Sequence, residues 1–368
     1  MRIAVVKERA GRELRVALVP ESAGRLVKAG SEVVVERGAG ESAGFLDAAY
    51  EKAGATLAGS AAEALRGADV LAKVQPPLPD EIGGIGANTV LISMVPAGTD
   101  RAVLDQLAAA QVTVLALEKV PRITRAQSMD ILSSQATVAG YKAVLLGANA
   151  LPRLMPMLTT AAGSLTPAKA FVIGAGVAGL QAIATARRLG AVVSAFDVRP
   201  AAKEQVQSLG ATFVAAEAVG QGAEDKGGYA KAQSGEEQAR TQQALANHIK
   251  DMDLVISTAA VPGKRAPVLI TEDMVRSMRA GSVIVDVAAE TGGNCALTQP
   301  GESVVAHDVL IIGPLNLAST MPLHASQMFS RNVLTLLQHL SKDGRVVIDL
   351  NDEITGPMCL AHAGQLRS

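Results

Sequence analysis

The clearest chemical signal in this 368-residue sequence is a set of closely spaced glycines after a short apolar run. Residues 170–173 predict a strand, and a helical stretch follows the next residues, which are Gly174, Ala175, Gly176, Val177, Ala178 and Gly179. In a dinucleotide-binding turn Gly174 would permit the tight bend, Gly176 the approach of a pyrophosphate, and Gly179 close packing of helix on strand. The helix N-terminus would offer N–H groups to the phosphates. Dinucleotide binding is predicted, and a turn kept only for packing is the alternative.

A carboxylate that would select the cofactor ends the next predicted strand. Residues 192–196 are β-rich, and Asp197 follows them, 18 residues after Gly179. A carboxylate here accepts hydrogen bonds from the adenosine ribose hydroxyls and repels a 2′-phosphate, so NAD is favoured over NADP. Val198 and Arg199 come next and are further candidate contacts. Arg199 either meets a 2′-phosphate or faces the solvent beside the adenine, and we favour the second interpretation.

A second polar group lies in residues 122–135, just before a predicted long helix. It offers a guanidinium, an amide, a carboxylate and a hydroxyl, from Arg122, Gln127, Asp130 and Ser133. This set is suited to orienting a polar amide such as nicotinamide. Gln127, Asp130 and Ser134 are spaced at i, i+3 and i+7, which predicts that they share one helix face. In the alternative interpretation Thr124 and Asp130 only begin and cap an exposed helix.

The elements that must position these residues form two alternating series. Short β-rich runs separated by helical stretches predict βαβ units and a mainly parallel sheet in each series. The first series contains residues 3–6, 32–35, 70–74, 90–92 and 112–115. The second contains residues 170–173, 192–196, 212–215, 254–257, 283–287 and 309–312. A helix predicted over residues 126–149 joins them, so we expect an α/β protein of two Rossmann-like domains separated by a cleft.

The same pattern places the domain boundaries. We expect an N-terminal α/β domain of residues 1–138, to which a final helix and polar tail, about residues 322–368, return because a lone amphipathic helix must bury its apolar face. Residues 139–321 form the NAD-binding domain. In doubly wound sheets the carboxyl ends of the strands face the cofactor, so Ala259 is a candidate contact. Residues 217–237 lack hydrophobic periodicity and predict a long loop.

Composition excludes several other classes of protein. The formal net charge is −1, aromatic residues make up 2% and tryptophan is absent, which argues against nucleic-acid binding. Uncharged runs are too short or too often broken by glycine for a membrane span. Cys295 and Cys359 lack partners at metal or disulfide spacing, the five histidines form no ligand pattern, and the N-terminus has no apolar signal core. We expect a cytoplasmic protein without a metal.

Residues 121–135 resemble the signature of the NAD(H)-binding component, domain I, of proton-translocating NAD(P) transhydrogenase. The resemblance covers essentially the whole chain and includes residues 7–8, 15–17, 20–21, 73–76, 174–187, 202–206, 227–231, 262–264 and 290–295. It implies that Arg122, Gln127 and Asp130 act at the reacting end of the cofactor and that these residues, with Ser133, hold the nicotinamide. Gln127 would lie between two nicotinamides. Gly228 and Tyr229 would belong to a mobile loop that closes over the nucleotide, the alternative being a disordered surface loop.

The resemblance also implies the assembly in which such a chain works. NAD(H) would bind here and NADP(H) on a partner subunit, and hydride would pass directly between them. A separate membrane-spanning subunit would move the proton, so the chain would be active only with its partners. We expect a homodimer attached peripherally, through partner subunits, to the inner face of the cytoplasmic membrane, with no nucleic acid and no direct membrane insertion.

The relative to be distinguished is alanine dehydrogenase, which shares both domains. That family uses a lysine in the strand matching residues 70–74 and a histidine in the segment matching residues 91–98. Lys73 is present here, but residues 91–98 contain no histidine, so the general acid and base of reductive amination would be missing. Arg15 and Lys73 are then expected to form an ion-paired remnant of a substrate pocket. A non-enzymatic NAD-sensing module is the remaining alternative.

Overall fold

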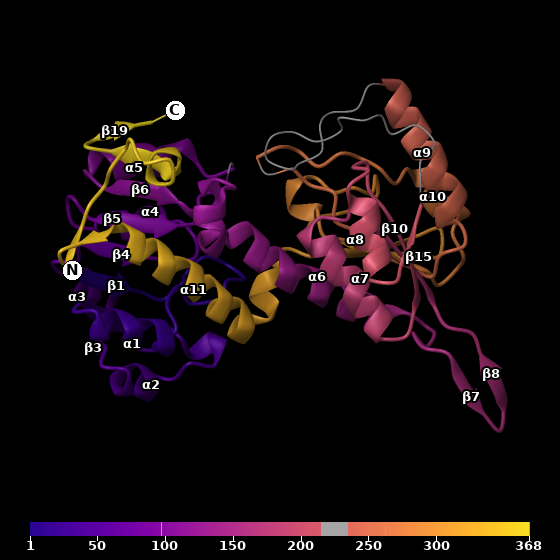
Figure 1. Ribbon diagram of the computed structural model, residues 1–368, viewed down its shortest axis with the longest axis horizontal. Coiled ribbons are helices and arrows are strands. Elements are labelled where there is room, and N and C mark those ends of the chain that lie inside the picture. Colours follow the sequence, from indigo (N-terminus) through magenta and orange to yellow (C-terminus); the bar gives the residue numbers. More distant parts are fainter. Residues whose placement is uncertain (97, 215–234, 262, 368) are drawn as a thin grey trace. The chain divides into compact units, whose positions relative to one another are not determined.

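The computed structural model describes residues 1–368 apart from residues 97, 215–234, 262 and 368. The chain forms two compact units, Met1–Gln135 with Ala318–Ser368, and Ala136–Leu317 (Figure 1). Each unit is an α/β structure built on a mainly parallel sheet, which confirms the predicted fold class. The units end at Gln135 and Leu317, a few residues before positions 138 and 321, where the sequence analysis puts the domain boundaries.

An eight-stranded sheet forms the centre of the first unit, in the order β19-β18-β6-β5-β4-β1-β2-β3. Its parallel strands are β1 (Arg2–Val5), β2 (Glu32–Glu36), β3 (Thr56–Ala58), β4 (Val70–Ala72), β5 (Val90–Ser93) and β6 (Thr113–Ala116). The helices between them are α1 (Pro20–Lys28), α2 (Asp47–Lys52), α3 (Ala61–Leu65), α4 (Pro79–Ile82) and α5 (Arg101–Ala109). Strand β3 is absent from the predicted strands because three residues are too few to show a period.

Helix α1 shows how local sequence sets the ends of an element. Pro20 lies in the first turn, where the N–H that proline lacks would have no helical partner. Gly30 follows the C-cap residue Ala29 with φ +87°, a conformation that glycine adopts without strain. Ala23 and Leu26 are buried in the core of the unit. The helix therefore starts, stops and packs as its residues predict.

The end of the chain belongs to the first unit. Helix α11 (Pro322–Leu340) buries Phe329, Val333 and Leu336 in its core. The residues after it do not form the expected polar tail, because they contain β16 (Ser341–Lys342), β17 (Arg345–Val346), α12 (Thr355–Met358), β18 (Cys359–His362) and β19 (Gln365–Leu366). Strand β18 pairs antiparallel with β6. Such short strands show almost no periodicity, and the place of β18 in the sheet depends on β6, a strand far away in the sequence.

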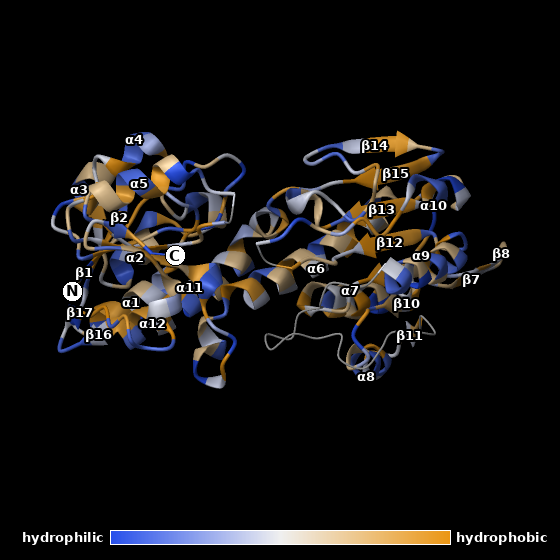
Figure 2. Cartoon of the chain, turned by 90° about the horizontal axis from the view of Figure 1, so that it is seen from above, coloured by the Kyte–Doolittle hydropathy of each residue, from blue (hydrophilic) through white to orange (hydrophobic). Residues whose placement is uncertain are grey.

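A seven-stranded sheet forms the centre of the second unit, in the order β11-β10-β9-β12-β13-β15-β14. Its strands are β9 (Lys169–Ile173), β10 (Val192–Phe196), β11 (Thr212–Phe213), β12 (Leu254–Ser257), β13 (Val283–Asp286), β14 (Ser303–Ala306) and β15 (Val309–Ile312). The helices are α6 (Ile131–Ala150), which begins in the first unit, α7 (Val177–Arg188), α8 (Ala202–Ser208), α9 (Gly235–Ile249) and α10 (Glu272–Ser277). Figure 2 shows β12, β13 and β15 as apolar, as expected for parallel strands covered on both faces. Strand β14 is an antiparallel edge strand.

Two predicted segments need correction. The helix expected over residues 126–149 starts later, because a 3₁₀ segment, η3 (Thr124–Met129), occupies its first residues and α6 starts at Ile131. Apolar spacing alone does not distinguish a 3₁₀ turn from the first turn of an α-helix. The loop expected over residues 217–237 ends earlier, because Gly235 begins α9 and two glutamates follow in its positive first turn. Residues 215–234 lie outside the described residues.

The remaining short elements connect the larger ones. A hairpin of β7 (Leu158–Thr160) and β8 (Gly163–Leu165) is formed of exposed residues and is absent from the predicted strands. The other 3₁₀ segments are η1 (Glu41–Ala43), η2 (Leu117–Lys119), η4 (Ala289–Thr291) and η5 (Leu317–Thr320). No helix in the described part of the chain is long and apolar enough to cross a bilayer.

Candidate functional site

The glycine-rich turn lies at the carboxyl end of β9, between this strand and helix α7. Gly174 has φ +92°, and a Cβ atom there would lie 2.9 Å from Oγ1 of Thr258. A Cβ at Gly179 would lie 1.8 Å from the carbonyl oxygen of Gly174, closer than any atoms approach without bonding. Both glycines are therefore required by the protein itself: one by backbone conformation, the other by the contact of helix and turn.

At position 176, by contrast, no contact with a described residue requires a glycine. Gly176 is the N-cap residue of α7 with φ −76°, and a Cβ built on it would meet no atom of the described residues within 4 Å. The space beside it is therefore open at the N-terminus of a twelve-residue helix, where backbone N–H groups and the helix dipole favour an anion. A pyrophosphate would fit beside this turn, because the open space lies where the phosphates are expected from the sequence.

Behind the turn, helices α6 and α7 approach each other closely. A Cβ at Gly140 of α6 would lie 2.1 Å from the carbonyl oxygen of Ala178, and one at Gly147 would lie 2.4 Å from Cδ1 of Leu254. These two glycines let α6 lie against α7 and the sheet. The sequence analysis missed them, although two small residues seven apart on one predicted helix are a signal of close packing.

Asp197 begins the segment after β10 and is almost fully buried. Its Oδ2 accepts a hydrogen bond of 2.7 Å from the backbone N–H of Ala175, so the carboxylate holds the glycine-rich turn. Both of its oxygens also accept from Arg199, with nitrogen–oxygen distances of 2.8 Å. The side chain that the sequence predicts as a ribose acceptor is thus already bonded to its own protein, and a ribose hydroxyl would share the carboxylate with these donors.

Arg199 does not face the solvent, which corrects the interpretation favoured above. Its side chain is only 18% exposed and forms an ion pair with Asp197. The pairing of residues two apart depends on the turn after β10, which sequence spacing does not reveal. Val198, between them, is half-buried and packs against the core cluster that contains Phe171 and Phe196.

Replacing Asp197 with Ala is expected to weaken NADH binding by roughly 10- to 150-fold, about 1.5–3 kcal/mol, because a charge-assisted acceptor and the anchor of Ala175 are both lost. Calorimetric titration with NADH measures this change. Asp253→Ala is the matched control, because Asp253 is also buried and accepts from an arginine, Arg153, and from the N–H of Lys169 at the start of β9. The control should lose stability and keep affinity. Equal affinity in Asp197→Ala and the parent would remove Asp197 from the site.

A buried polar group shapes the neighbouring loop after β12. Oδ1 of Asn294 accepts from Oγ of Ser257 and from the N–H of Ala259, and its Nδ2 donates to the carbonyl of Ala259. Asp286 in turn accepts from the backbone N–H of Asn294 at 2.7 Å. Burial raises the pKa of Asp286, although its hydrogen bonds oppose the shift. Ala259 is therefore held rigidly beside the glycine-rich turn, where Thr258 contacts Gly174. The sequence analysis does not single out Asn294 or Asp286.

The second polar group lies in the first unit, at the junction of η3 and α6. Asp130 caps α6: its Oδ1 accepts from the N–H of Ser133 at 2.9 Å and its Oδ2 from the Ser133 hydroxyl at 2.6 Å. The expectation that Gln127, Asp130 and Ser134 share one helix face is wrong, because the helix starts after Asp130. Asp130 caps α6, as the alternative interpretation expects, but the first turn of this helix is buried or half-buried and not exposed, and the cap does not exclude a binding role.

The structure brings part of this group together. Asp130 and Ser133 contact each other and are half-buried, whereas Arg122 and Gln127 are exposed. The Gln127 side chain makes no hydrogen bond to any described residue. Gly228 and Tyr229 lie outside the described residues, so their predicted role in a closing loop stays a prediction.

Comparison with known proteins decides the family. Residues 4–139 match the family described as alanine dehydrogenase/PNT, N-terminal domain, and residues 143–368 match the alanine dehydrogenase/PNT, C-terminal domain. The chain belongs to the alanine dehydrogenase/PNT family. This finding confirms the resemblance described above.

Within the alanine dehydrogenase/PNT family the chain is more similar to two transhydrogenases than to an alanine dehydrogenase. It is 48% identical over 375 residues to the first portion of the alpha subunit of NAD(P) transhydrogenase from Rhodospirillum rubrum, a match that covers 100% of this chain and 97% of the relative. The structure of transhydrogenase from Sinorhizobium meliloti is similar with a TM-score of 0.90 at 44% identity, over 99% of both chains. Alanine dehydrogenase of Mycobacterium tuberculosis is 29% identical over 353 residues, 94% of this chain and 88% of that one.

Lys73 and Arg15, the two residues expected to be ion-paired, both form buried ion pairs within the first unit. Nζ of Lys73 lies 3.4 Å from Oε2 of Glu8 and 3.7 Å from Oε2 of Glu81. Arg15 forms a bidentate pair with Glu13 at 2.7 and 2.8 Å. Burial raises the pKa of Glu8, and the neighbouring Lys73 opposes the shift. The expected ion pairing is confirmed, because both cations are paired with carboxylates within the unit, and their origin as a remnant of a substrate pocket stays a prediction.

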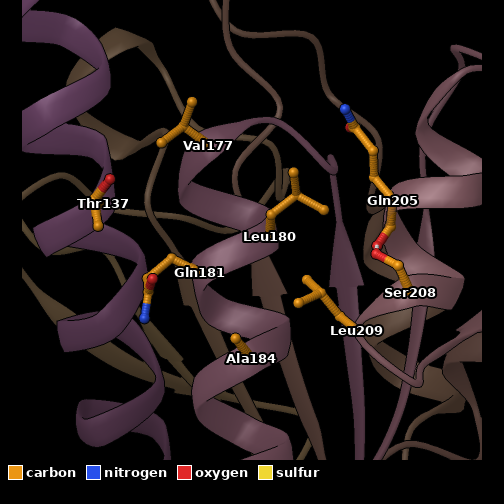
Figure 3. A pocket seen from close by; sticks show the side chains of 8 residues that line it. All are labelled: Thr137, Val177, Leu180, Gln181, Ala184, Gln205, Ser208 and Leu209. Carbon is orange, nitrogen blue, oxygen red and sulfur yellow. Dashed lines mark hydrogen bonds between the residues drawn. The ribbon is translucent and has the colours of Figure 1, made fainter. Parts of the chain in front are cut away.

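A hollow of about 410 Å³ lies beside the glycine-rich turn and not on it (Figure 3). Its lining comes from α6, α7 and from α8 with the residue that follows it, and contains no charged residue: Thr137, Val177, Leu180, Gln181, Ala184, Gln205, Ser208 and Leu209. Of the predicted cofactor contacts it includes only Val177. Without a charged or buried polar group to fix a ligand, we do not assign this hollow to the cofactor. No cluster of His, Cys, Asp or Glu in the described residues is arranged to hold a metal ion.

Proposed function

We propose that this chain is the NAD(H)-binding subunit of a proton-translocating NAD(P) transhydrogenase. The observation that carries the proposal is the match along the whole chain to a transhydrogenase alpha subunit at 48% identity, against 29% for an alanine dehydrogenase. The chain's own chemistry agrees with it. The glycine-rich turn has open space for a pyrophosphate at Gly176, and residues 91–98 contain no histidine to serve reductive amination.

The proposed contacts divide into two groups. The turn and the segment after β10 hold the adenosine and pyrophosphate through Gly174, Ala175, Gly176, Val177, Gly179, Asp197, Val198, Arg199 and Ala259. The polar segment before α6 holds the nicotinamide through Arg122, Gln127, Asp130 and Ser133. Gly228 and Tyr229 close over the bound nucleotide.

In this mechanism hydride passes directly from C4 of one nicotinamide to C4 of the other. No proton is exchanged in that step, so the chain needs no general acid or base, and the neutralised Lys73 and Glu8 are not required for it. Its residues instead align the rings and exclude water, and alignment of two reactants can lower a barrier by several kcal/mol. We propose that the amide of Gln127 contacts the second nucleotide. Its exposure supports this role, as does the cap formed by Asp130 and Ser133, which fixes the end of the segment that carries Gln127.

The second nucleotide, NADP(H), belongs to a partner subunit in this proposal. A further, membrane-spanning subunit moves the proton, because no described helix of this chain crosses a bilayer. We propose that the chain is a homodimer and that its partners attach it to the inner face of the cytoplasmic membrane.

The test is a comparison of the chain alone with the chain plus an NADP(H)-binding partner domain. Alone, it should bind NADH and show no oxidation of alanine and no reduction of pyruvate with ammonia. With the partner domain, hydride exchange between the two nucleotides should start even without the membrane subunit, since both reacting carbons are then present. Alanine-dependent reduction of NAD by the chain alone would overturn the proposal in favour of an amino-acid dehydrogenase. Binding of NADH without exchange in the presence of the partner would favour a sensing module.

A further inference from the structure

The segment that carries Gln127 has one face buried in the core and one face exposed. Within η3, Ala126 and Met129 are buried in the core of the first unit, whereas Gln127 and Ser128 are exposed. A six-residue 3₁₀ segment has weaker hydrogen-bond geometry than an α-helix and keeps its shape only through its surroundings. The contacts that fix this segment therefore decide where the Gln127 side chain points.

One such contact comes from helix α11. Nδ2 of Asn332 donates a hydrogen bond of 2.7 Å to the backbone carbonyl of Ser128, the residue next to Gln127. Asn332 is only 8% exposed, and its Oδ1 is buried without a partner among the described residues. A half-satisfied buried amide is unfavourable for stability, so packing of α11 alone does not account for an asparagine here. The hydrogen bond that this amide donates to the Ser128 carbonyl does account for the asparagine.

A second contact reaches the segment from the end of the chain. Nη2 of Arg125, two residues before Gln127, lies 2.8 Å from Oδ2 of Asp352. Oδ1 of Asp352 accepts from Nε2 of His339 on α11 at 3.0 Å and from the N–H of Thr355 at 2.9 Å. Burial by itself would raise the pKa of Asp352, but these hydrogen bonds together hold the pKa below its ordinary value. Asp352 is thus a fixed, charged anchor, and the two contacts flank Gln127 on both sides.

We propose that Asn332 is a positioning residue for hydride transfer, which holds the Gln127 side chain in place through the carbonyl of Ser128, with the Arg125–Asp352 pair as a second anchor. The proposal rests on the proposed function, since it concerns the same reaction. Asn332 touches neither nucleotide. It acts by restricting the backbone on one side of Gln127, as Arg125 does on the other.

The experiment compares Asn332→Leu with Ser330→Ala in the full chain mixed with the NADP(H)-binding partner domain. Ser330 is a matched control, because it is buried on the same helix and its Oγ accepts from the N–H of Val19, away from η3. Asn332→Leu should lower the exchange rate at saturating nucleotides by about tenfold, since a misplacement of about 1 Å costs up to about a hundredfold. NADH affinity should stay within about twofold, because Gln127 contributes more to alignment than to ground-state affinity. Ser330→Ala should lose stability and keep the rate.

Two further variants test the mechanism of the effect. Asn332→Gln, which retains an amide donor, should recover part of the lost rate. Arg125→Gln should lower the rate about threefold without unfolding the protein, because its side chain is 55% exposed. If Asn332→Leu does not fold, a parental rate in Arg125→Gln overturns the proposal.

The outcomes separate this inference from the function on which it rests. A parental rate in Asn332→Leu, or an equal loss in Ser330→Ala, overturns the positioning role while exchange by the parent still supports the proposed function. If the parent chain and partner domain exchange no hydride, the proposed function fails and the positioning role fails with it.

Discussion

Gly176→Ala is expected to weaken NADH binding strongly while thermal unfolding of the protein stays almost unchanged. The added methyl group meets no atom within 4 Å in the part of the chain that the structure describes, and φ of −76° suits alanine as well as glycine. At an N-cap this exchange costs helix stability by about 1 kcal/mol or less. The methyl would instead occupy the space that a pyrophosphate needs beside the first N–H groups of α7. Affinity should fall by about a hundredfold or more, the equivalent of about 2.7 kcal/mol.

Gly179→Ala provides the contrast that makes this test specific. Its methyl would lie 1.8 Å from the carbonyl oxygen of Gly174, so helix and turn must move apart and stability should fall together with affinity. Calorimetry measures both quantities, by titration with NADH and by thermal unfolding. Undiminished NADH affinity in Gly176→Ala would show that phosphates do not approach this turn.

Gln127→Asn is expected to lower hydride exchange with the NADP(H)-binding partner domain by about tenfold or more, with NADH binding nearly intact. The side chain is exposed and bonded to no described residue, so shortening it by one methylene does not disturb the fold. An interaction made mainly in the transition state appears in the rate at saturation and not in affinity.

Single-turnover kinetics with both nucleotides saturating measure the rate, and titration calorimetry measures the affinity. Gln338→Asn is a suitable control, because Gln338 is exposed on α11 and has no proposed role. A full exchange rate in Gln127→Asn would remove Gln127 from between the rings and leave the other assignments standing.

Much of the fold could be predicted because its determinants are local. Strands such as β12 and β13 are buried on both faces, so they are continuous apolar runs in the sequence. The glycine-rich turn could be recognised for the same reason: φ at Gly174 and the contact at Gly179 involve neighbours within a few residues. Residue types located the second polar group but left it open between a binding site and a capped helix, and only the resemblance of residues 121–135 to a known family favoured the binding site.

Only the tertiary structure decided what these residues contact. Asp197 was recognisable as a carboxylate at a strand end, but its bonds to Ala175 and Arg199 depend on how the turn after β10 folds back. Asn332 and Ser128 are 204 residues apart, and one buried amide gives no periodic signal in either segment. Sequence patterns report burial and backbone conformation, which repeat along an element. Hydrogen-bond partners from distant segments do not repeat, so they become visible only when the chain is folded.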